Sequence, residues 1–319
     1  AKTITNSIYG VTGWDKFFLY DKETAEAVTL AGQEVIKKTA SYVDGVTEAN
    51  VIYGDTDSNY ISFPESWNQK RCVEAAHNIC DRLEADVYPQ VAESMGIDAA
   101  DCEWRIDPEM YASRFLQWGK KKKYAYLATW KEGMDPDEEI DHPKPKISGS
   151  AAKRSDSSRL TRDTEKEAIT AILHGRTDDV NQIVYKAATK IDPTNPDWEA
   201  IGIPGGISKK FSEYEKPTAH VEAAQNANAL CGTDFSEGSK PMRVYLQPAY
   251  FDEVGEKIDR IAYEDEDDLR PVRDRLTVDA ARMTQTLLVN PLGEMLEAVG
   301  VDVDAAVAGQ NQTGLGAFL

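Results

Sequence analysis

The spacing of apolar residues changes along the chain and separates segments of different secondary structure. In residues 22–43 apolar side chains recur every three or four positions, the spacing of a helix with one buried face, and Gly45 is suited to end it. Asp21 precedes this segment and is a residue type that caps the first helical turn. In residues 51–63 two short runs of β-branched and aromatic residues flank a Gly-Asp-Thr-Asp sequence, which predicts a β-hairpin.

The rest of the chain is predicted to contain more helices than strands. A long helix is expected at residues 67–94, a pair of strands around residues 114–131, and a loop at residues 134–146, where prolines and acidic residues gather. From residue 156 onward the spacing is mainly helical. The segments expected there are helices at residues 164–174, 180–189 and 278–299, a loop at residues 192–210 and a short strand at residues 242–247.

The composition is that of a globular protein with a strong acidic excess. The chain has 319 residues, 41% of them hydrophobic, and its 36 Lys and Arg against 55 Asp and Glu give a net charge of −19. These values exclude a wholly disordered chain, and no apolar run approaches the roughly 20 residues that cross a bilayer. The acidic excess argues against a nucleic-acid-binding protein, for which a basic surface is typical.

The cysteines and the first residues bear on the cellular compartment. Cys72, Cys80, Cys102 and Cys231 form no C-x-x-C pair, which argues against a zinc ribbon, an iron–sulfur site or a disulfide scaffold. We interpret them as reduced thiols. Residues 1–10 lack the basic and then apolar build of a secretory signal, so we expect a cytoplasmic protein.

Asp55-Thr56-Asp57, at the tip of the predicted hairpin, is a candidate metal site. Alternate side chains of a strand point to one face, so Asp55 and Asp57 can converge on one cation. Hard divalent ions such as Mg²⁺ bind carboxylates together with substrate phosphates. A D-x-D sequence in an acidic chain is also common in plain solvated turns. The apolar flanks anchor this turn, and both interpretations remain open from these residues alone.

The first ten residues offer a second candidate site. On a helix Lys2, Asn6 and Tyr9 stand at positions i, i+4 and i+7 and therefore share one face. That face would combine an ammonium group able to reach a phosphate, an amide and an aromatic ring. An amphipathic terminal helix without a ligand explains the same pattern.

A run of four lysines, Lys120 to Lys123, is followed by Tyr124 inside the predicted strand region. Strand alternation would place Lys120, Lys122 and Tyr124 on one face, with Lys121 and Lys123 on the other. Successive ammonium groups repel one another unless an anion compensates them, and a phosphate backbone is a natural partner. The alternative is a solvated edge strand that its lysines protect from aggregation.

Taken in order, these three segments resemble a known family. K-x-x-x-N-S-x-Y-G, then Y-G-D-T-D-S, then K-K-K-Y is similar to the C-terminal half of a family B DNA polymerase, and the resemblance extends more weakly over nearly the whole chain. It implies an α+β fold, with an antiparallel palm sheet and packed helices followed by a mostly helical thumb domain. The implied divisions are the end of the fingers helix at residues 1–20, the palm at 21–155, the thumb at 156–307 and a C-terminal tail at 308–319.

The resemblance also assigns roles to individual residues. Lys2 would contact the incoming triphosphate, while Asn6 and Tyr9 would lie by the nascent base pair. Asp57 would be the principal metal ligand and Asp55 would support the site near the primer end, so both count as catalytic. The implied DNA contacts are Thr56, Lys121, Lys122, Lys123, Tyr124 and Arg154.

Arg154 belongs to a segment, residues 147–156, that resembles the family's K-G…R-R-D stretch. Ser148 and Lys153 depart from that pattern, which leaves the contacts of the segment less defined.

The implied reaction is the attack of a primer 3′-hydroxyl on the α-phosphate of a dNTP, with release of pyrophosphate. Two Mg²⁺ ions roughly 4 Å apart would steady the attacking and leaving oxygens. The family's other palm aspartate motif and its exonuclease domain would both precede the first residue here. We therefore expect this chain alone not to extend primers on template DNA, and to need a missing N-terminal polymerase portion as a partner.

The last residues resemble the Q-x-x-h-x-x-a-a peptide by which replication proteins bind a sliding clamp. The residues that would contact the clamp are Gln312, Leu315, Phe318 and Leu319. A frayed apolar tail is the alternative interpretation.

Two other functions are compatible with part of the sequence. Metal-dependent glycosyltransferases also use D-x-D, but interpreting the chain as one of them assigns no role to the first ten residues or to the lysine run. A non-catalytic DNA- and clamp-binding polymerase fragment would not need both aspartates. For a DNA-binding enzyme, the charge of −19 suggests the salt-rich cytoplasm of a halophilic archaeon, because the Debye length at ~1 M salt is only about 3 Å.

Overall fold

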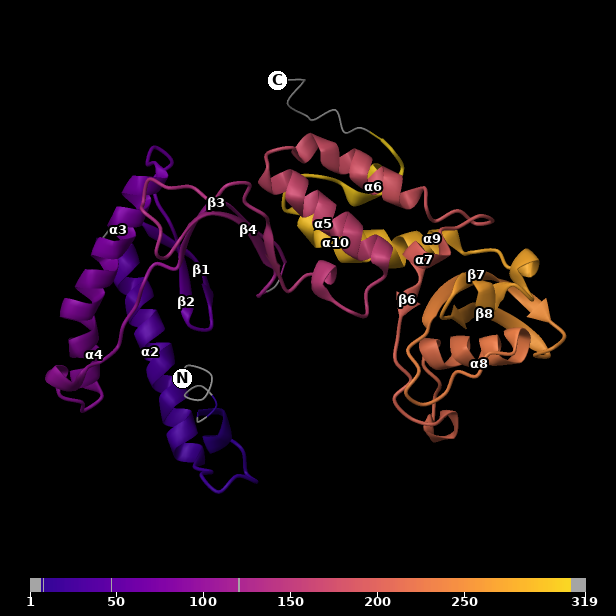
Figure 1. The fold of residues 1–319 in the computed structure, drawn as a ribbon, viewed down its shortest axis with the longest axis horizontal. Helices are drawn as coiled ribbons and strands as arrows, with labels where there is room; N and C mark the ends of the chain where they lie inside the picture. Colours follow the sequence, from indigo (N-terminus) through magenta and orange to yellow (C-terminus); the bar gives the residue numbers. More distant parts are fainter. Residues whose placement is uncertain (1–6, 8, 47, 120, 311–319) are drawn as a thin grey trace. The chain divides into compact units, whose positions relative to one another are not determined.

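The computed structural model describes residues 7, 9–46, 48–119 and 121–310 (Figure 1). It divides the chain into two compact units, and each is described below by itself. Unit 1 comprises Ala1–Ser113 and Ala128–Pro143, and unit 2 comprises Arg114–Leu127 and Lys144–Leu319. The division crosses two neighbouring strands, β3 (Met110–Gln117) and β4 (Tyr124–Lys131).

Unit 1 begins with the helix and the hairpin that the apolar spacing predicts. Its elements are α2 (Lys22–Val46), β1 (Asn50–Asp55), β2 (Ser58–Ser62), α3 (Gln69–Arg82), a π-helical turn (Leu83–Val87), α4 (Tyr88–Ser94) and a short 3₁₀ turn (Ala99–Asp101). Asp21 caps α2 as expected, because its carboxylate accepts hydrogen bonds from the N–H and the hydroxyl of Thr24 at 3.1 and 2.7 Å. The helix predicted at residues 67–94 is α3 and α4, joined without a break by the π-turn.

A small core fastens the hairpin of unit 1 to its helices. Buried side chains of α2, α3 and the π-turn meet partly buried residues of both hairpin strands there. The Thr39 and Tyr88 hydroxyls are 2.9 Å apart and join α2 to α4. Asp44 accepts a 2.7 Å hydrogen bond from the Val51 N–H, which ties the end of α2 to the start of β1. The hairpin therefore stands on a packed base.

Unit 2 contains more helices than strands. Its helices are α5 (Arg159–Leu173), α6 (Val180–Ala188), α7 (Trp198–Ile201), α8 (Ala219–Cys231), α9 (Ala280–Thr284), a π-turn (Gln285–Val289), α10 (Asn290–Glu297) and α11 (Val303–Val307). Its strands beyond β3 and β4 are β5 (Lys146–Ser148), β6 (Ile203–Pro204), β7 (Met242–Phe251) and β8 (Glu256–Tyr263). Short 3₁₀ turns lie at Ala151–Lys153, Thr177–Asp179, Phe211–Glu213, Glu266–Leu269 and Arg273–Arg275.

Two antiparallel arrangements organise unit 2. β4 pairs with β5 and has β3 on its other side, and β7 lies between β6 and β8. One core lies around the β6–β7–β8 sheet with α7, α8 and the π-turn after α9, and a second lies among α5, α6 and α10. The predicted α+β class is confirmed. Within it the sequence missed α8 and β8, and the loop expected at residues 192–210 contains α7 and β6.

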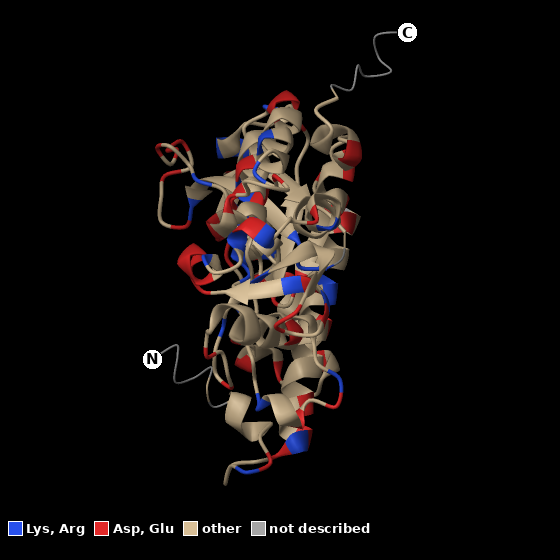
Figure 2. Ribbon diagram, turned by 90° about the vertical axis from the view of Figure 1, so that its right-hand side faces the viewer, with Lys and Arg blue, Asp and Glu red and all other residues tan. Residues whose placement is uncertain are grey.

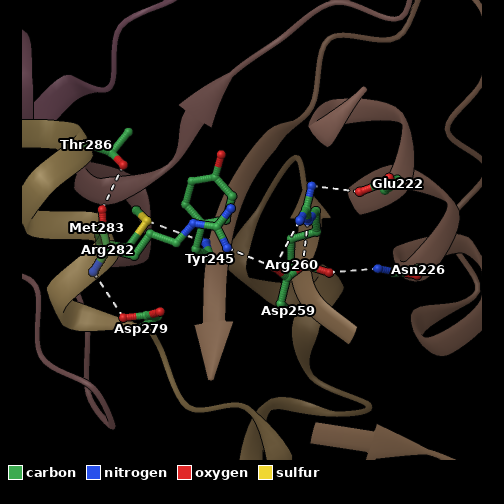
Figure 3. A network of polar contacts seen from close by, with 9 residues as sticks. All are labelled: Glu222, Asn226, Tyr245, Asp259, Arg260, Asp279, Arg282, Met283 and Thr286. Carbon is green, nitrogen blue, oxygen red and sulfur yellow. Dashed lines mark hydrogen bonds and ion pairs between the residues drawn. The ribbon is translucent and has the colours of Figure 1, made fainter. Parts of the chain in front are cut away.

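A polar network joins α8, the β7–β8 hairpin and α9 (Figure 3). Arg260 of β8 bonds to Glu222 of α8 at 2.7 Å and to the adjacent Asp259 at 2.5 Å. Asp259 also accepts a 2.8 Å bond from Arg282 of α9, whose guanidinium lies 3.6 Å from the ring centroid of Tyr245. The hydrogen bond from Arg260 lowers the pKa of Asp259 to about 2. The network thus holds two helices on one hairpin.

Among the described residues, none of the helices has the length and apolar character needed to cross a membrane.

Candidate metal-binding hairpin and basic surface

The Asp55-Thr56-Asp57 sequence lies at the tip of the β1–β2 hairpin, as predicted. Asp55 is paired in register with Ser58, so that Thr56 and Asp57 connect the two strands. Asp55 is half-buried, whereas Thr56 and Asp57 are exposed. Tyr53 is buried behind the tip and its ring lies 5.6 Å from that of Tyr60, its partner in the ladder. A packed ladder therefore carries two carboxylates to an accessible turn.

The tip itself is tightly bent. The Asp57 N–H donates to the Asp55 carbonyl at 2.7 Å, a bond between residues i and i+2, and Thr56 between them has φ +58°. Such three-residue turns with a positive central φ are rare and strained, and a β-branched residue is an outlier there. The Thr56 hydroxyl also donates to Asp55 Oδ1 at 3.1 Å. The turn thus fixes the backbone between the two carboxylates.

The donor set of this tip fits a hard divalent cation incompletely. Carboxylate oxygens are the ligands that Mg²⁺ accepts from proteins, alongside water and substrate phosphates. The described residues contain no group of three or more His, Cys, Asp or Glu side chains that could hold a metal. Asp55 and Asp57 are therefore ligands of the right kind for such a cation, but by themselves they can supply only part of its coordination.

The first predicted site lies mostly outside the described residues. Lys2 and Asn6 are not among them, and Tyr9 lies in a helical segment with 45% of its surface exposed. The segment continues into a set of exposed apolar side chains that we call the N-terminal apolar surface. It consists of Trp14, Phe18, Leu19, Tyr20, Val28 and Leu30, which are between 44% and 85% exposed.

The lysine run differs from its prediction. Lys121 and Lys122 lie in the connection between β3 and β4, and only Tyr124 belongs to a strand. The expected alternation of lysines between two strand faces is therefore wrong for these residues, because Lys122 has φ +72°, which no strand residue adopts. Lys120 lies outside the described residues.

The lysines and Tyr124 have defined surroundings in unit 2. Lys121 and Lys122 are exposed, and Lys123 pairs with Glu294 of α10 at 2.6 Å. The Tyr124 ring stacks between Phe115 of β3 and Tyr126 of β4, with centroids 5.9 and 6.3 Å away. The connection thus presents two ammonium groups to solvent beside a rigid aromatic stack.

Gly149 brings a second basic segment against this connection. It has φ +64°, and a Cβ atom there would lie 2.0 Å from the Lys122 carbonyl oxygen, so only glycine allows the approach. The chain then turns through Ala151–Lys153 into Arg154, and both Lys153 and Arg154 are exposed. We call Lys121, Lys122, Lys153 and Arg154 the basic surface.

Arg154 is already engaged by a carboxylate. Its Nε and Nη2 donate to the two oxygens of Asp156 at 2.9 and 2.6 Å. These bonds lower the pKa of Asp156 to about 2. Because both side chains are more than half exposed, the pair is worth little to stability and can exchange for an external anion.

The predicted clamp-binding residues Gln312, Leu315, Phe318 and Leu319 lie outside the described residues. Their role stays a prediction.

Comparisons with known proteins assign the chain to a family. A family model described as DNA polymerase family B matches residues 1–278. The chain belongs to that family. It is 28% identical over 274 residues to a DNA polymerase 2 of Aeropyrum pernix and 26% identical over 230 residues to a DNA polymerase of Archaeoglobus fulgidus. It is 25% identical over 320 residues to a DNA polymerase of a Thermococcus species.

The matched regions are short parts of these relatives. They cover 83%, 72% and 100% of this chain, but only 30%, 25% and 36% of the Aeropyrum, Archaeoglobus and Thermococcus polymerases. The chain thus spans about a quarter to a third of the curated relatives it matches.

The sequence did not predict three features of this region: the N-terminal apolar surface, the close approach of Gly149, and the buried Glu165 of α5. A signal existed for Glu165, because Thr161, Ala168 and Ile169 place it on the buried face of the helix at helical spacing. No local signal could show the contact of Gly149 with Lys122, which depends on the tertiary fold.

Proposed function

We propose that this chain supplies the palm and thumb of a family B DNA polymerase, with the palm at residues 21–155 and the thumb at residues 156–307. The reaction is template-directed transfer of a nucleotide from a dNTP to the primer 3′-hydroxyl. The observation that carries the proposal is the Asp55-Thr56-Asp57 tip, two carboxylates on a packed hairpin in a chain of this family. Family membership leaves the glycosyltransferase alternative without support.

The chain's own residues have separable tasks in this reaction. Asp57 and Asp55 would hold the Mg²⁺ ions together with ligands from another part of the polymerase, and bound Mg²⁺ would supply charge stabilisation for the transfer. The strained turn fixes the backbone that carries both carboxylates before substrate arrives, which reduces the reorganisation that accompanies the reaction. Thr56 contacts the primer end.

Other residues bind the substrates. The lysines at positions 121–123 and Arg154 bind phosphates of the primer–template duplex, and Tyr124 packs against its backbone. Lys2, Asn6 and Tyr9 face the dNTP.

The polymerase portion that carries the other palm aspartates is a necessary partner. The N-terminal apolar surface supports this, because several large apolar side chains exposed along one stretch of chain are typical of a segment that another surface covers. We propose that this portion covers it, whether it stands in the same polypeptide or in another. The C-terminal residues add a tether to the sliding clamp, and the acidic surface adapts the enzyme to a salt-rich cytoplasm.

A primer-extension experiment tests the proposal. The chain alone, with primer–template DNA, dNTPs and Mg²⁺, is expected to show no extension, whereas the chain joined to or co-expressed with the N-terminal polymerase portion extends the primer. Asp57→Asn abolishes extension by the reunited enzyme, and Asp101→Asn, an exposed acid elsewhere in unit 1, leaves it unchanged. Robust extension by the chain alone contradicts the need for a partner. DNA binding without extension by the reunited enzyme favours a non-catalytic fragment.

A further inference from the structure

Glu165 of α5 is a buried carboxyl group directly beneath the second basic segment. Only 1% of its surface is exposed. Its Oε2 accepts a 2.5 Å hydrogen bond from the N–H of Ala152, in the 3₁₀ turn Ala151–Lys153. When Glu165 is ionised, this hydrogen bond is charge-assisted and therefore stronger than one between neutral groups. Glu165 is therefore a firm attachment point for that turn.

The surroundings of Glu165 disfavour its charge. Burial raises the pKa of Glu165 to about 7, although the Ala152 N–H and the charge of Lys123 favour the ionised form. The Ser150 hydroxyl also favours it, without reaching full hydrogen-bond geometry to any described residue. Neutral side chains fill such positions at lower energetic cost, and a buried carboxyl group that holds a turn in place and has a shifted pKa is a candidate for a functional role.

The turn that Glu165 holds carries half of the basic surface. It begins just after Gly149, which lies against the Lys122 carbonyl, and it ends at Lys153 and Arg154. Lys123, whose charge acts on Glu165, is fixed in turn by Glu294 of α10. The two basic segments and α5 thus form one connected assembly within unit 2.

We propose that Glu165 is a positioning residue that fixes the turn before Arg154, so that Lys153 and Arg154 face the same duplex phosphates as Lys121 and Lys122. This inference rests on the proposed function. Glu165 itself touches no DNA. Its effect on DNA affinity passes entirely through Lys153 and Arg154.

Equilibrium binding of the full chain to a primer–template duplex, measured by fluorescence anisotropy over a range of KCl concentrations, tests this. Glu165→Ala is expected to weaken binding roughly threefold to tenfold and to reduce the salt slope by about 1 to 2, the change expected for one or two lost phosphate contacts. Glu165→Gln keeps an acceptor oxygen and falls between the wild type and Glu165→Ala. Glu167→Ala, an exposed acid on the same helix, does not weaken binding.

A double-mutant cycle separates positioning from general destabilisation. In a Lys153→Ala/Arg154→Ala background, Glu165→Ala is expected to cause no further loss of affinity, because the residues it positions are gone. If Glu165→Ala reduces DNA affinity equally in the wild type and in the Lys153→Ala/Arg154→Ala background, the proposal is wrong. It is also wrong if Lys153→Ala/Arg154→Ala binds DNA weakly but Glu165→Ala alone binds it as well as the wild type does. If neither that double variant nor Lys121→Ala/Lys122→Ala weakens binding, the proposed DNA interface itself fails.

Hydrogen exchange gives a readout that requires only the conservative variant to fold. In Glu165→Gln at pH 8, where the wild-type carboxyl group is ionised, the Ala152 amide is expected to exchange faster than in the wild type, because a charge-assisted bond becomes a neutral one, while amides in the middle of α5 stay protected. Unchanged exchange at Ala152 contradicts the proposed attachment.

Discussion

Thr56 carries the clearest local strain in the candidate site. Its φ of +58° places a β-branched residue where only glycine and a few polar residues are at ease. Strain of this kind costs on the order of 1–3 kcal/mol and persists only where the surrounding structure imposes it. Here the paired strands and the buried Tyr53 impose it, so the bend between Asp55 and Asp57 is set before any ligand binds.

Replacing Thr56 with glycine should relieve this strain. We expect Thr56→Gly to be more stable than Thr56→Ala by about 1 kcal/mol, because alanine keeps the unfavourable positive φ and both variants lose the hydroxyl bond to Asp55. Urea denaturation of both variants measures the difference. Equal stability of the two would show that the turn is not strained.

Glu165 makes a prediction about pH that is separate from DNA binding. Its folded pKa of about 7 lies above the ordinary value of 4.5, so between these values the folded state retains a proton that the unfolded state has released. This contribution to stability is full below pH 4.5 and is lost as the pH rises through 7. Glutamine does not titrate. The free energy of unfolding of Glu165→Gln, relative to that of the wild type, should therefore increase by about 3 kcal/mol from pH 4.5 to pH 8.

Urea denaturation of both proteins at a series of pH values between 4.5 and 8 measures this difference. The carboxylates with lowered pKa values, Asp156 and Asp259, titrate below this range and affect both proteins equally. Glu167→Gln serves as the control and should show no such trend. A constant difference between Glu165→Gln and the wild type across the range would contradict the raised pKa.

At the level of elements, the sequence predicted best where signals are local. The cap residue Asp21 and the regular apolar spacing identify α2, and the Gly-Asp-Thr-Asp turn between two β-branched runs identifies the β1–β2 hairpin. The D-x-D candidate could be located for the same reason. Its strain could not, since a positive φ at threonine is opposed by local preference and arises from the paired strands.

The sequence did not predict the elements whose structure is determined by tertiary contacts. The β8 strand carries Asp259 and Arg260, which look like loop residues until the bonds to α8 and α9 are seen (Figure 3). Helix α8 buries mainly alanines, and these give weak apolar spacing. In the lysine run the alternation of a strand does not apply, because Lys121 and Lys122 lie in a turn that packs against the backbone of Gly149. The roles assigned to residues outside the described parts stay predictions.

Gly149 offers a test of how the basic surface is assembled. Gly149→Ala should destabilise the protein by about 3 kcal/mol or more, because the new Cβ meets the Lys122 carbonyl in addition to the strain of a positive φ. Gly255 is the matched control: its φ is +77° and a Cβ atom there would have no described atom within 4 Å, so Gly255→Ala should cost only about 1 kcal/mol. Chemical denaturation distinguishes the two. Equal losses would mean that the contact with Lys122 can relax freely.

For the whole molecule, the net charge is the property whose interpretation changes most once the family is known. Acidic residues are spread along the described elements, with basic residues interspersed among them (Figure 2). Most of the described ion pairs are exposed, as in Arg270–Asp267 with side chains 78% and 71% exposed, and such pairs contribute little. The excess of 55 acidic over 36 basic residues instead makes net self-repulsion the larger long-range effect. The acidic excess is thus compatible with DNA binding at a local basic surface.

Salt should therefore stabilise this protein. The Debye length falls from about 10 Å at 0.1 M to about 3 Å at 1 M salt, and this screens the repulsion between surface carboxylates. Salt also weakens the exposed ion pairs, but these contribute little to stability in the first place. We expect the thermal unfolding midpoint of the full chain to rise steadily from 0.1 M into molar KCl. In a variant with Glu93, Asp101 and Glu103 changed to their amides, which removes three exposed negative charges from unit 1, the rise should be smaller. A midpoint that is highest at low salt would contradict both the repulsion argument and the proposed adaptation to a salt-rich cytoplasm. An identical rise in the variant would instead show that these three charges play no part in it.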